Sequence, residues 1–289
     1  MCSLRSLDVM RLQLMLNVSP MRLRTVFALL SASLILSSRS SQAQALDTLA
    51  ARVGGRQIHM VASGSGSPTI VLEAGFGSTS RTWRALQQEL AATHRVVAYD
   101  RAGLGASAAS PRPRTSGVIA EELREALRSA GVSPPFLLIG HSAGGLHARV
   151  FASMYPQDVV GLVLVDPTPD GFEERARVEM PSVLAHFDSL ERADTVGASV
   201  GERGEDAGWA ESLNEARRSD GGFRGRVIVL SASRPELLGL GTIWTDQHRR
   251  WSAAEPTREY VLLPGAGHNI HQERREAVLA AVRRVLATP

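Results

Sequence analysis

The sequence predicts an α/β domain built on a largely parallel sheet, and two observations support this. Short apolar or β-branched runs of strand length alternate with stretches in which apolar residues recur every three or four positions, as on a helix face. At one junction a strand-like run is followed by a sharp glycine-flanked turn and then by a helical pattern. Strands that alternate with helical segments are typical of βαβ units, whose strands run parallel.

The individual elements follow from these patterns. The strand candidates are residues 56–62, 69–73, 95–99, 136–140, 159–165, 226–230 and 257–263. The helix candidates are residues 81–92, 116–130, 144–155, 241–253 and 272–286. The sequence Gly-Ser-Gly-Ser-Pro at 64–68 predicts a turn, which could join the first two strand candidates as a hairpin.

Residues 167–225 break the alternation, because they contain no convincing strand. A structureless loop of this length is implausible inside a compact domain. We therefore predict a helical cap, inserted after the sixth strand of the sheet and lying over one end of it. Its candidate pocket-lining side chains are Phe172, Leu184, Phe187 and Trp209. The alternative is a pair of surface helices with no contact to a site.

The first 45 residues have the organisation of a secretory signal peptide. Residues 21–24 read Met-Arg-Leu-Arg, an apolar run covers 25–36, and a serine-rich stretch ends in Ala-Gln-Ala at 43–45. A basic start, an apolar core too short to span a bilayer and an A-x-A site are the parts of such a signal. We predict cleavage near Ala45, export to the periplasm or the medium, and Met21 as a candidate true start. An uncleaved N-terminal anchor is the alternative.

Composition excludes several kinds of chemistry. All 32 basic residues are arginines, so no lysine can form a Schiff base or complete a Walker-type phosphate loop. A single cysteine, Cys2, allows no intrachain disulfide and no cysteine-rich metal site. Five arginines and one aspartate fall within residues 1–45, so the chain after the signal has a formal net charge of −1 rather than +3. We see no electrostatic case for nucleic-acid binding, which needs a clustered basic stripe.

Ser142 is the candidate nucleophile. It is the centre of Gly-His-Ser-Ala-Gly at 140–144, which follows an apolar run and precedes a helical pattern. This is the G-x-S-x-G motif in the strand–turn–helix context that it requires. The turn presents the Ser142 hydroxyl near a helix N-terminus, where developing negative charge is stabilised. A plain tight turn is the alternative.

Two backbone amides are candidates for an oxyanion hole. The amide of Ala143 directly follows the nucleophile, and the amide of Phe76 lies in Glu-Ala-Gly-Phe-Gly at 73–77, after an earlier strand. The glycines on either side of Phe76 allow that loop to turn inward. A simple glycine-rich turn is the alternative for this loop.

His268 is the candidate general base, because it follows the last strand and returns to the end of the sheet where Ser142 emerges. The acid that orients the imidazole has two candidates. Asp166 ends the strand 159–165, 24 residues after Ser142, and is favoured. Glu236 is the nearest carboxylate after the next strand. A strand-end carboxylate that caps a turn is the alternative for Asp166.

Together these segments resemble the α/β-hydrolase fold superfamily, from about residue 52 to residue 286. The motifs that carry the resemblance are Leu-Glu-Ala-Gly-Phe-Gly at 72–77, Tyr-Asp-Arg-Ala-Gly-Leu-Gly-Ala-Ser at 99–107, Gly-His-Ser-Ala-Gly-Gly at 140–145 and Gly267-His268. The resemblance implies an eight-stranded sheet, a cap over the active site, and no metal or organic cofactor. It implies that Asp100 and Arg101 support the oxyanion loop, in which Ala74 stands where many relatives have histidine. In some members the acid follows the sixth strand, which favours Asp166.

The predicted function is cleavage of a carboxylic ester through an acyl-enzyme. Epoxide hydrolases and haloalkane dehalogenases of this fold use an aspartate nucleophile, so Ser142 disfavours both. Lactonase, cofactor-free perhydrolase (haloperoxidase-like), amidase and carbon–carbon hydrolase activities on the same residues remain as alternatives, as does a binding protein without turnover. The predicted partner is a small ester-like molecule, with no stable membrane span after signal cleavage. The sequence indicates no oligomeric state.

Overall fold

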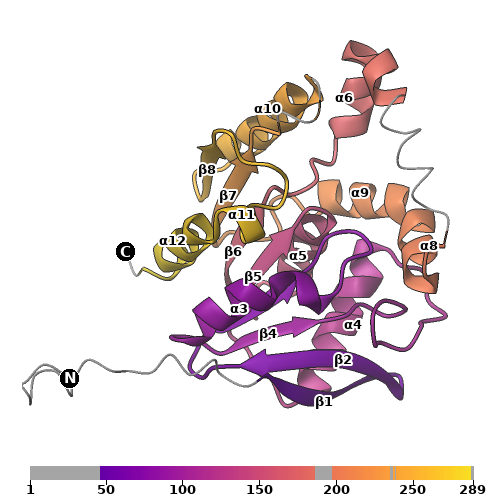
Figure 1. The fold of residues 1–289 in the computed structure, drawn as a ribbon, viewed down its shortest axis with the longest axis vertical. Helices are drawn as coiled ribbons and strands as arrows, with labels where there is room; N and C mark the ends of the chain where they lie inside the picture. The colour runs from indigo at the N-terminus through magenta and orange to yellow at the C-terminus, as the bar shows by residue number, and fades with distance from the viewer. Residues whose placement is uncertain (1–45, 186–196, 235–236, 238, 288–289) are drawn as a thin grey trace, which may run out of the picture. The chain divides into compact units, whose positions relative to one another are not determined.

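A computed structural model describes residues 46–185, 197–234, 237 and 239–287. The predicted signal peptide, residues 1–45, lies outside this part of the chain. The described residues form an eight-stranded sheet in the order β1-β2-β4-β3-β5-β6-β7-β8 (Figure 1). β2 pairs antiparallel with β1 and with β4, and the other neighbouring strands are parallel. The predicted fold class, a mostly parallel α/β sheet flanked by helices, is confirmed.

Strands and helices alternate along the chain much as the sequence patterns predict. The strands are β1 (Asp47–Val53), β2 (Arg56–Ser63), β3 (Thr69–Glu73), β4 (Val96–Tyr99), β5 (Phe136–His141), β6 (Val159–Val165), β7 (Arg226–Ala232) and β8 (Arg258–Leu263). The helices before β7 are the 3-10 helix η1 (Ser80–Trp83), α3 (Arg84–Ala91), α4 (Ser116–Ser129), α5 (Ala143–Met154), α6 (Phe172–Glu179), α8 (Val200–Ala207) and α9 (Trp209–Arg218). After β7 come α10 (Leu240–Ala253), α11 (Ile270–Glu273) and α12 (Arg275–Leu286).

The arrangement of the first strands differs from the expectation. β1 is not among the strand candidates, because most of its side chains are exposed and its apolar pattern is correspondingly weak. It forms a hairpin with β2 through a turn at Gly54 and Gly55, both of which have positive φ angles. The expected hairpin between β2 and β3 is wrong, since β4 lies between them in the sheet.

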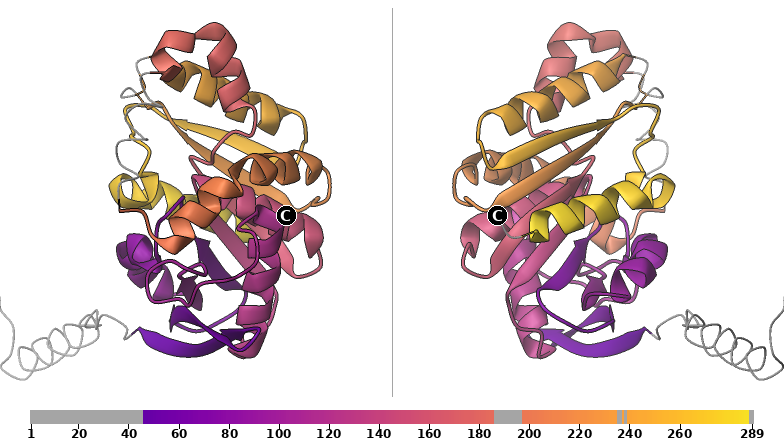
Figure 2. Two further views of the ribbon diagram at one scale, coloured as in Figure 1. Left: turned by 90° about the vertical axis from the view of Figure 1, so that its right-hand side faces the viewer. Right: turned by 90° about the vertical axis from the view of Figure 1, so that its left-hand side faces the viewer.

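Two layers of helices cover the sheet, and the alternation of strand side chains divides the core between them (Figure 2). Leu138 of β5 packs in the cluster that includes α4 and α5, whereas its neighbours Leu137 and Ile139 pack in the cluster that includes α3 and α12. Strands buried on both faces need apolar residues at every position. This explains why the central strands read as uninterrupted apolar runs in the sequence.

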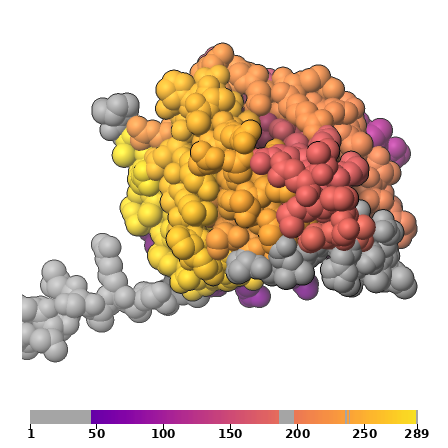
Figure 3. Space-filling view, turned by 90° about the horizontal axis from the view of Figure 1, so that it is seen from above, coloured from indigo at the N-terminus to yellow at the C-terminus, as the bar shows by residue number. Residues whose placement is uncertain are grey.

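The chain between β6 and β7, residues 167–225, is here called the insertion, and its described parts contain α6, α8 and α9. α6 packs against α10 through an apolar cluster that includes Ala176, Leu240 and Ile243, and Figure 3 shows the two segments side by side in red and gold. α9 packs on α4 and α5. Within the ranges described, no helix is long and apolar enough to cross a membrane.

Candidate active site

Ser142 is the single residue between the end of β5 and the start of α5, and its backbone conformation is strained. Its φ and ψ angles are 54° and −126°, a region that non-glycine residues rarely adopt. The strain is held by neighbouring backbone: the Ser142 amide donates to the Val165 carbonyl at 3.2 Å, and the Ser142 carbonyl accepts from the Gly145 amide at 2.8 Å. The hydroxyl-bearing carbon is therefore fixed at the carboxyl end of the sheet.

The glycines of this turn are required by close backbone approach. A Cβ atom on Gly144 would lie 2.3 Å from the carbonyl oxygen of Glu73 and 2.5 Å from that of Ala74. A Cβ atom on Gly140 would lie 2.5 Å from the carbonyl oxygen of Gly144. The first turn of α5 thus sits directly against the start of the loop that follows β3, which carries one of the two predicted oxyanion donors.

Asp166 and His268 come together across the ends of β6 and β8. His268 Nδ1 lies 2.6 Å from Asp166 Oδ2, over a sequence separation of 102 residues. Asp166 is fully buried, whereas the His268 side chain is 23% exposed. A proton on Nδ1 is donated to the carboxylate, so Nε2 is the ring nitrogen that can accept a further proton.

Asp166 is held by donors that the sequence does not reveal. Its Oδ1 atom accepts from the Ala232 amide and from the Trp244 indole Nε1, each at 3.0 Å. The Arg234 guanidinium covers the Trp244 ring at 4.7 Å, with Nε 3.9 Å from Asp166 Oδ2. Burial raises the pKa of Asp166 to about 6, and these donors and the nearby positive charge oppose the rise. By opposing the rise in pKa, the donors and the positive charge keep the Asp166 carboxyl ionised near neutral pH.

A row of rings continues from His268 into the protein. His268, His141, His271 and Trp83 follow one another with centroid separations of 4.5, 4.3 and 4.5 Å. His141 Nε2 lies 3.0 Å from the carbonyl oxygen of His268 and donates to it. Burial lowers the pKa of His141 to about 3 and that of His271 to about 2, and repulsion between the imidazoles adds to the effect. Both rings are therefore neutral. His141 contacts His268 directly, and His271 is buried behind His141.

The loop after β3 carries the predicted oxyanion residue Phe76. Gly75 lies against the nucleophile turn, since a Cβ atom there would be 3.3 Å from Ser142 Cβ. Phe76 is 41% exposed and meets Trp209 of the insertion edge to face at 6.1 Å. Ala143, the first residue of α5, is buried beside Ser142.

A buried charge cluster supports this loop from behind. Arg101 donates to the carbonyl oxygens of Ala74 and Gly75 at 2.7 and 2.6 Å. It also binds Glu73 of β3 and Glu205 of α8. Asp100 accepts from the Ser80 and Ala106 amides at 2.7 and 3.0 Å, which fixes the adjoining turn. The contacts of Asp100 and Arg101 are those of loop supports.

Two of the sequence candidates lie outside the described residues, namely the alternative acid Glu236 and the candidate lining residue Phe187. Sequence reasoning did not identify Trp244 or Glu205, because each reaches its partner only through the tertiary fold. Among residues 46–185, 197–234, 237 and 239–287, no group of three His, Cys, Asp or Glu side chains is placed to hold a metal ion.

Comparison with known proteins agrees with this architecture. The model of the alpha/beta hydrolase family matches residues 70–281. The chain belongs to the alpha/beta hydrolase family. The Bacillus subtilis (strain 168) protein YqjL is 28% identical over 221 residues, which are 76% of this chain and 83% of YqjL.

One further relative and one solved structure of similar fold cover different shares of this hydrolase. A putative carbamate hydrolase, RutD of Azorhizobium caulinodans, is 34% identical over 124 residues, 42% of this chain and 46% of RutD. The structure of a thermophilic esterase from Thermogutta terrifontis superposes with a TM-score of 0.58 at 22% identity, covering 84% of this chain and 100% of the esterase. At this identity the structural likeness establishes the fold.

Proposed function

We propose that this alpha/beta hydrolase is an exported serine hydrolase that cleaves carboxylic esters through an acyl-enzyme. The observation that carries the proposal is the pair formed by Asp166 and His268 at the sheet end where Ser142 is held at a φ angle of 54°. A nucleophile on a strained turn, an imidazole and a buried carboxylate in this chain order match the requirements for acyl transfer. Export rests on the signal-like residues 21–45.

The proposed reaction uses each group in turn. His268 Nε2 takes the proton of the Ser142 hydroxyl as Ser142 attacks the ester carbonyl, and Asp166 stabilises the imidazolium that forms. The amides of Phe76 and Ala143 bind the oxyanion. Collapse of this intermediate releases the alcohol, which takes its proton from His268. Water, activated by His268, then attacks the acyl-enzyme and releases the acid.

Aromatic side chains around these groups favour a substrate with an apolar part. Phe76 and Trp209 stand at the oxyanion loop, and Trp244 meets Phe172 edge to face at 5.0 Å and His268 at 5.8 Å. In this proposal the insertion acts as a cap, because Trp209 and Phe172 both belong to it. An apolar acyl or alcohol group would pack against these rings.

A fluorophosphonate probe tests the proposal on the exported fraction of cells that produce the protein. We expect covalent labelling, with the adduct located by mass spectrometry on the peptide that contains Ser142 and with an intact mass that begins at Leu46. Ser142→Ala is the control. The purified enzyme is then given matched acetyl and aromatic acyl esters of one phenol, a lactone, a carbamate and an amide. Equal labelling of Ser142→Ala, or no turnover of any ester, would contradict the proposal.

Replacing Trp244 by Phe tests the hydrogen bond on Asp166. The indole donor favours the ionised carboxylate, so its removal raises the pKa of Asp166 further above its ordinary value. A hydrogen bond to a charged group is worth about 1.5–3 kcal/mol, so the acid limb of kcat/KM against pH should move upward by about 1–2 units. Trp251→Phe is a matched control, since Trp251 Nε1 donates to Asp220 at 2.8 Å, away from the site. An unchanged acid limb would show that Trp244 does not tune Asp166.

A further inference from the structure

The direction of the Phe76 amide is set by the peptide bond that joins Gly75 to Phe76. In a trans peptide the C=O and N–H groups point in opposite directions, and this bond is trans. Arg101 Nη2 donates to the Gly75 carbonyl at 2.6 Å, and Arg101 Nη1 donates to the preceding Ala74 carbonyl at 2.7 Å. Since Arg101 holds the carbonyl ends of two successive peptides, the Phe76 N–H is turned to the side away from the guanidinium.

Arg101 is itself held by Glu205, which belongs to the insertion. Glu205 Oε1 accepts from Arg101 Nε at 2.6 Å, and Glu205 Oε2 accepts from Arg101 Nη2 at 2.9 Å. The same Oε2 atom accepts from the Gly77 amide at 3.0 Å. The carboxylate of α8 therefore fixes the chain after Phe76 directly and the chain before Phe76 through Arg101.

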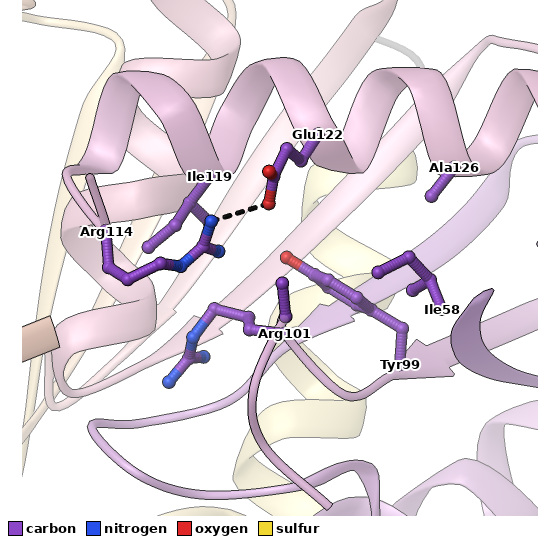
Figure 4. Close-up of a pocket in the computed structure, with 8 residues that line it drawn as sticks. Ile58, Tyr99, Arg101, Arg114, Ile119, Glu122 and Ala126 are labelled. Carbon is purple, nitrogen blue, oxygen red and sulfur yellow. Dashed lines mark hydrogen bonds and ion pairs between the residues drawn. The ribbon is translucent and has the colours of Figure 1, made fainter. Parts of the chain in front are cut away.

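The ion pairs of Arg101 with Glu205 and Glu73 are buried, and the two carboxylates keep Arg101 charged. Glu205 is 3% exposed and Arg101 is 2% exposed. Burial alone would lower the pKa of Arg101, but the carboxylates of Glu205 and Glu73 outweigh it and raise that pKa. Figure 4 shows Arg114 turned toward Glu122, with which it pairs at 2.6 Å, while the guanidinium of Arg101 points away from both. Arg101 thus stays charged, and its guanidinium donates to the carbonyl groups of the oxyanion loop.

We propose that Glu205 is a positioning residue, which orients the Phe76 amide through Arg101 and so couples the insertion to the oxyanion hole. The inference rests on the proposed function, since it needs an oxyanion at the Phe76 amide. Glu205 touches no substrate in this scheme. Its effect falls on the transition state, because only there does the carbonyl oxygen carry the charge that the amide binds.

Glu205→Gln tests the coupling while it keeps the size of the side chain. The amide nitrogen of glutamine cannot accept a hydrogen bond, so one of the two oxygens that hold Arg101 and Gly77 is lost. Loss of a whole oxyanion donor lowers kcat about 10²–10³-fold, and a misdirected amide should cost about 10–100-fold. KM should stay within about threefold, because an interaction confined to the transition state lowers kcat without changing ground-state binding.

Glu215→Gln is the matched control. Glu215 also lies on the insertion, and it accepts hydrogen bonds from the start of α4, from the Gly117 amide at 2.7 Å and from the Thr115 hydroxyl at 3.1 Å. None of these contacts involves the oxyanion loop. We expect its kcat to equal that of the wild type. Both variants are titrated with the fluorophosphonate probe, so that kcat refers to reactive enzyme, and both are unfolded in denaturant.

A trifluoromethyl ketone matched to the ester supplies the deciding measurement, because its tetrahedral adduct places an oxyanion in the same hole. Its inhibition constant should rise in Glu205→Gln by the factor that kcat falls, and should not change in Glu215→Gln. Equal kcat and inhibition constants in the two variants would overturn the inference while wild-type turnover leaves the proposed function standing. A wild type that neither labels nor turns over would overturn both. If Glu205→Gln does not fold, Glu205→Asp takes its place, with a smaller loss of kcat expected and the same two constants deciding.

Discussion

Asp166→Asn is expected to lower kcat about 10⁴-fold on an activated ester, with the fold intact. Asn has one oxygen to accept from Ala232 and Trp244, so its NH₂ group faces His268 Nδ1 in place of the second carboxylate oxygen. His268 must then accept at Nδ1 and carry its proton on Nε2, the atom needed to accept the proton of Ser142. The variant therefore holds the wrong tautomer of an otherwise well-placed base.

Asp220→Asn is the control for this prediction. Asp220 also accepts from an indole, that of Trp251 at 2.8 Å, and from Arg149 and Arg258, and it lies away from the site. Its replacement should leave kcat within about twofold. If Asp166→Asn kept kcat within tenfold of the wild type, the acid would have to be sought elsewhere, with Glu236 as the first alternative.

Asp166→Asn, although it lowers kcat, should raise the free energy of unfolding at high pH. Burial raises the pKa of Asp166 from 3.8 to about 6, so the folded state binds the proton more tightly than the unfolded chain. The stability that this carboxyl contributes is fully present below the unfolded pKa and is lost as the pH rises through about 6. Asp166→Asn stays neutral, so at pH 8 it should be more stable than the wild type by up to about 3 kcal/mol. Denaturant unfolding at pH 8 and near pH 4 should show this advantage shrinking at the lower pH.

Arg101→Met is expected to lower the free energy of unfolding by about 3–5 kcal/mol at pH 8. It removes the cation from between Glu73 and Glu205, which are both almost fully buried, and it frees the Ala74 and Gly75 carbonyls. Burial already raises the pKa of Glu73 despite the pairing with Arg101. Without Arg101 the carboxylates must stay charged and unpaired or take up protons, so the loss should grow as the pH rises.

Denaturant unfolding of the wild type and Arg101→Met at several pH values measures this loss. Arg112→Met is the matched control, because Arg112 pairs with Glu121 at the surface, where both side chains are more than 40% exposed. Exposed pairs of this kind are worth about 1 kcal/mol or less. Adding Glu205→Gln to Arg101→Met should recover part of the loss, since it removes one buried charge. A loss that is no larger than that of Arg112→Met would contradict the prediction.

The sequence patterns predicted the fold class where burial leaves a strong pattern. The central strands are buried on both faces and read as apolar runs, and the α4 helix buries residues that recur every three or four positions. The edge strand β1 has no such signal, because one face of it is open to solvent. The pairing of β2 with β4 rather than β3 is a long-range choice that a turn sequence does not reveal.

The candidate site divides in the same way. Ser142 and the glycines around it are identified by a local motif. Asp166 and His268 could be predicted because each follows a strand, and the carboxyl ends of parallel strands meet at one edge of the sheet. Trp244 and Glu205 carry no local signal, since their partners lie 78 and 104 residues away. Nothing in their neighbouring residues distinguishes them from ordinary core or surface positions of a helix.

The contact between Glu205 and Arg101 also limits how this enzyme can be recombined with its relatives. A laboratory chimaera that exchanged residues 167–225 for the corresponding segment of another family member would remove Glu205 and leave Arg101 facing a foreign helix. The donor segment would then have to bring its own carboxylate to the same point, or the recipient loop would lose its anchor on both sides of Phe76. Residues 167–225 and residues 73–101 therefore have to be exchanged together, unless the donor segment supplies a carboxylate at the position of Glu205.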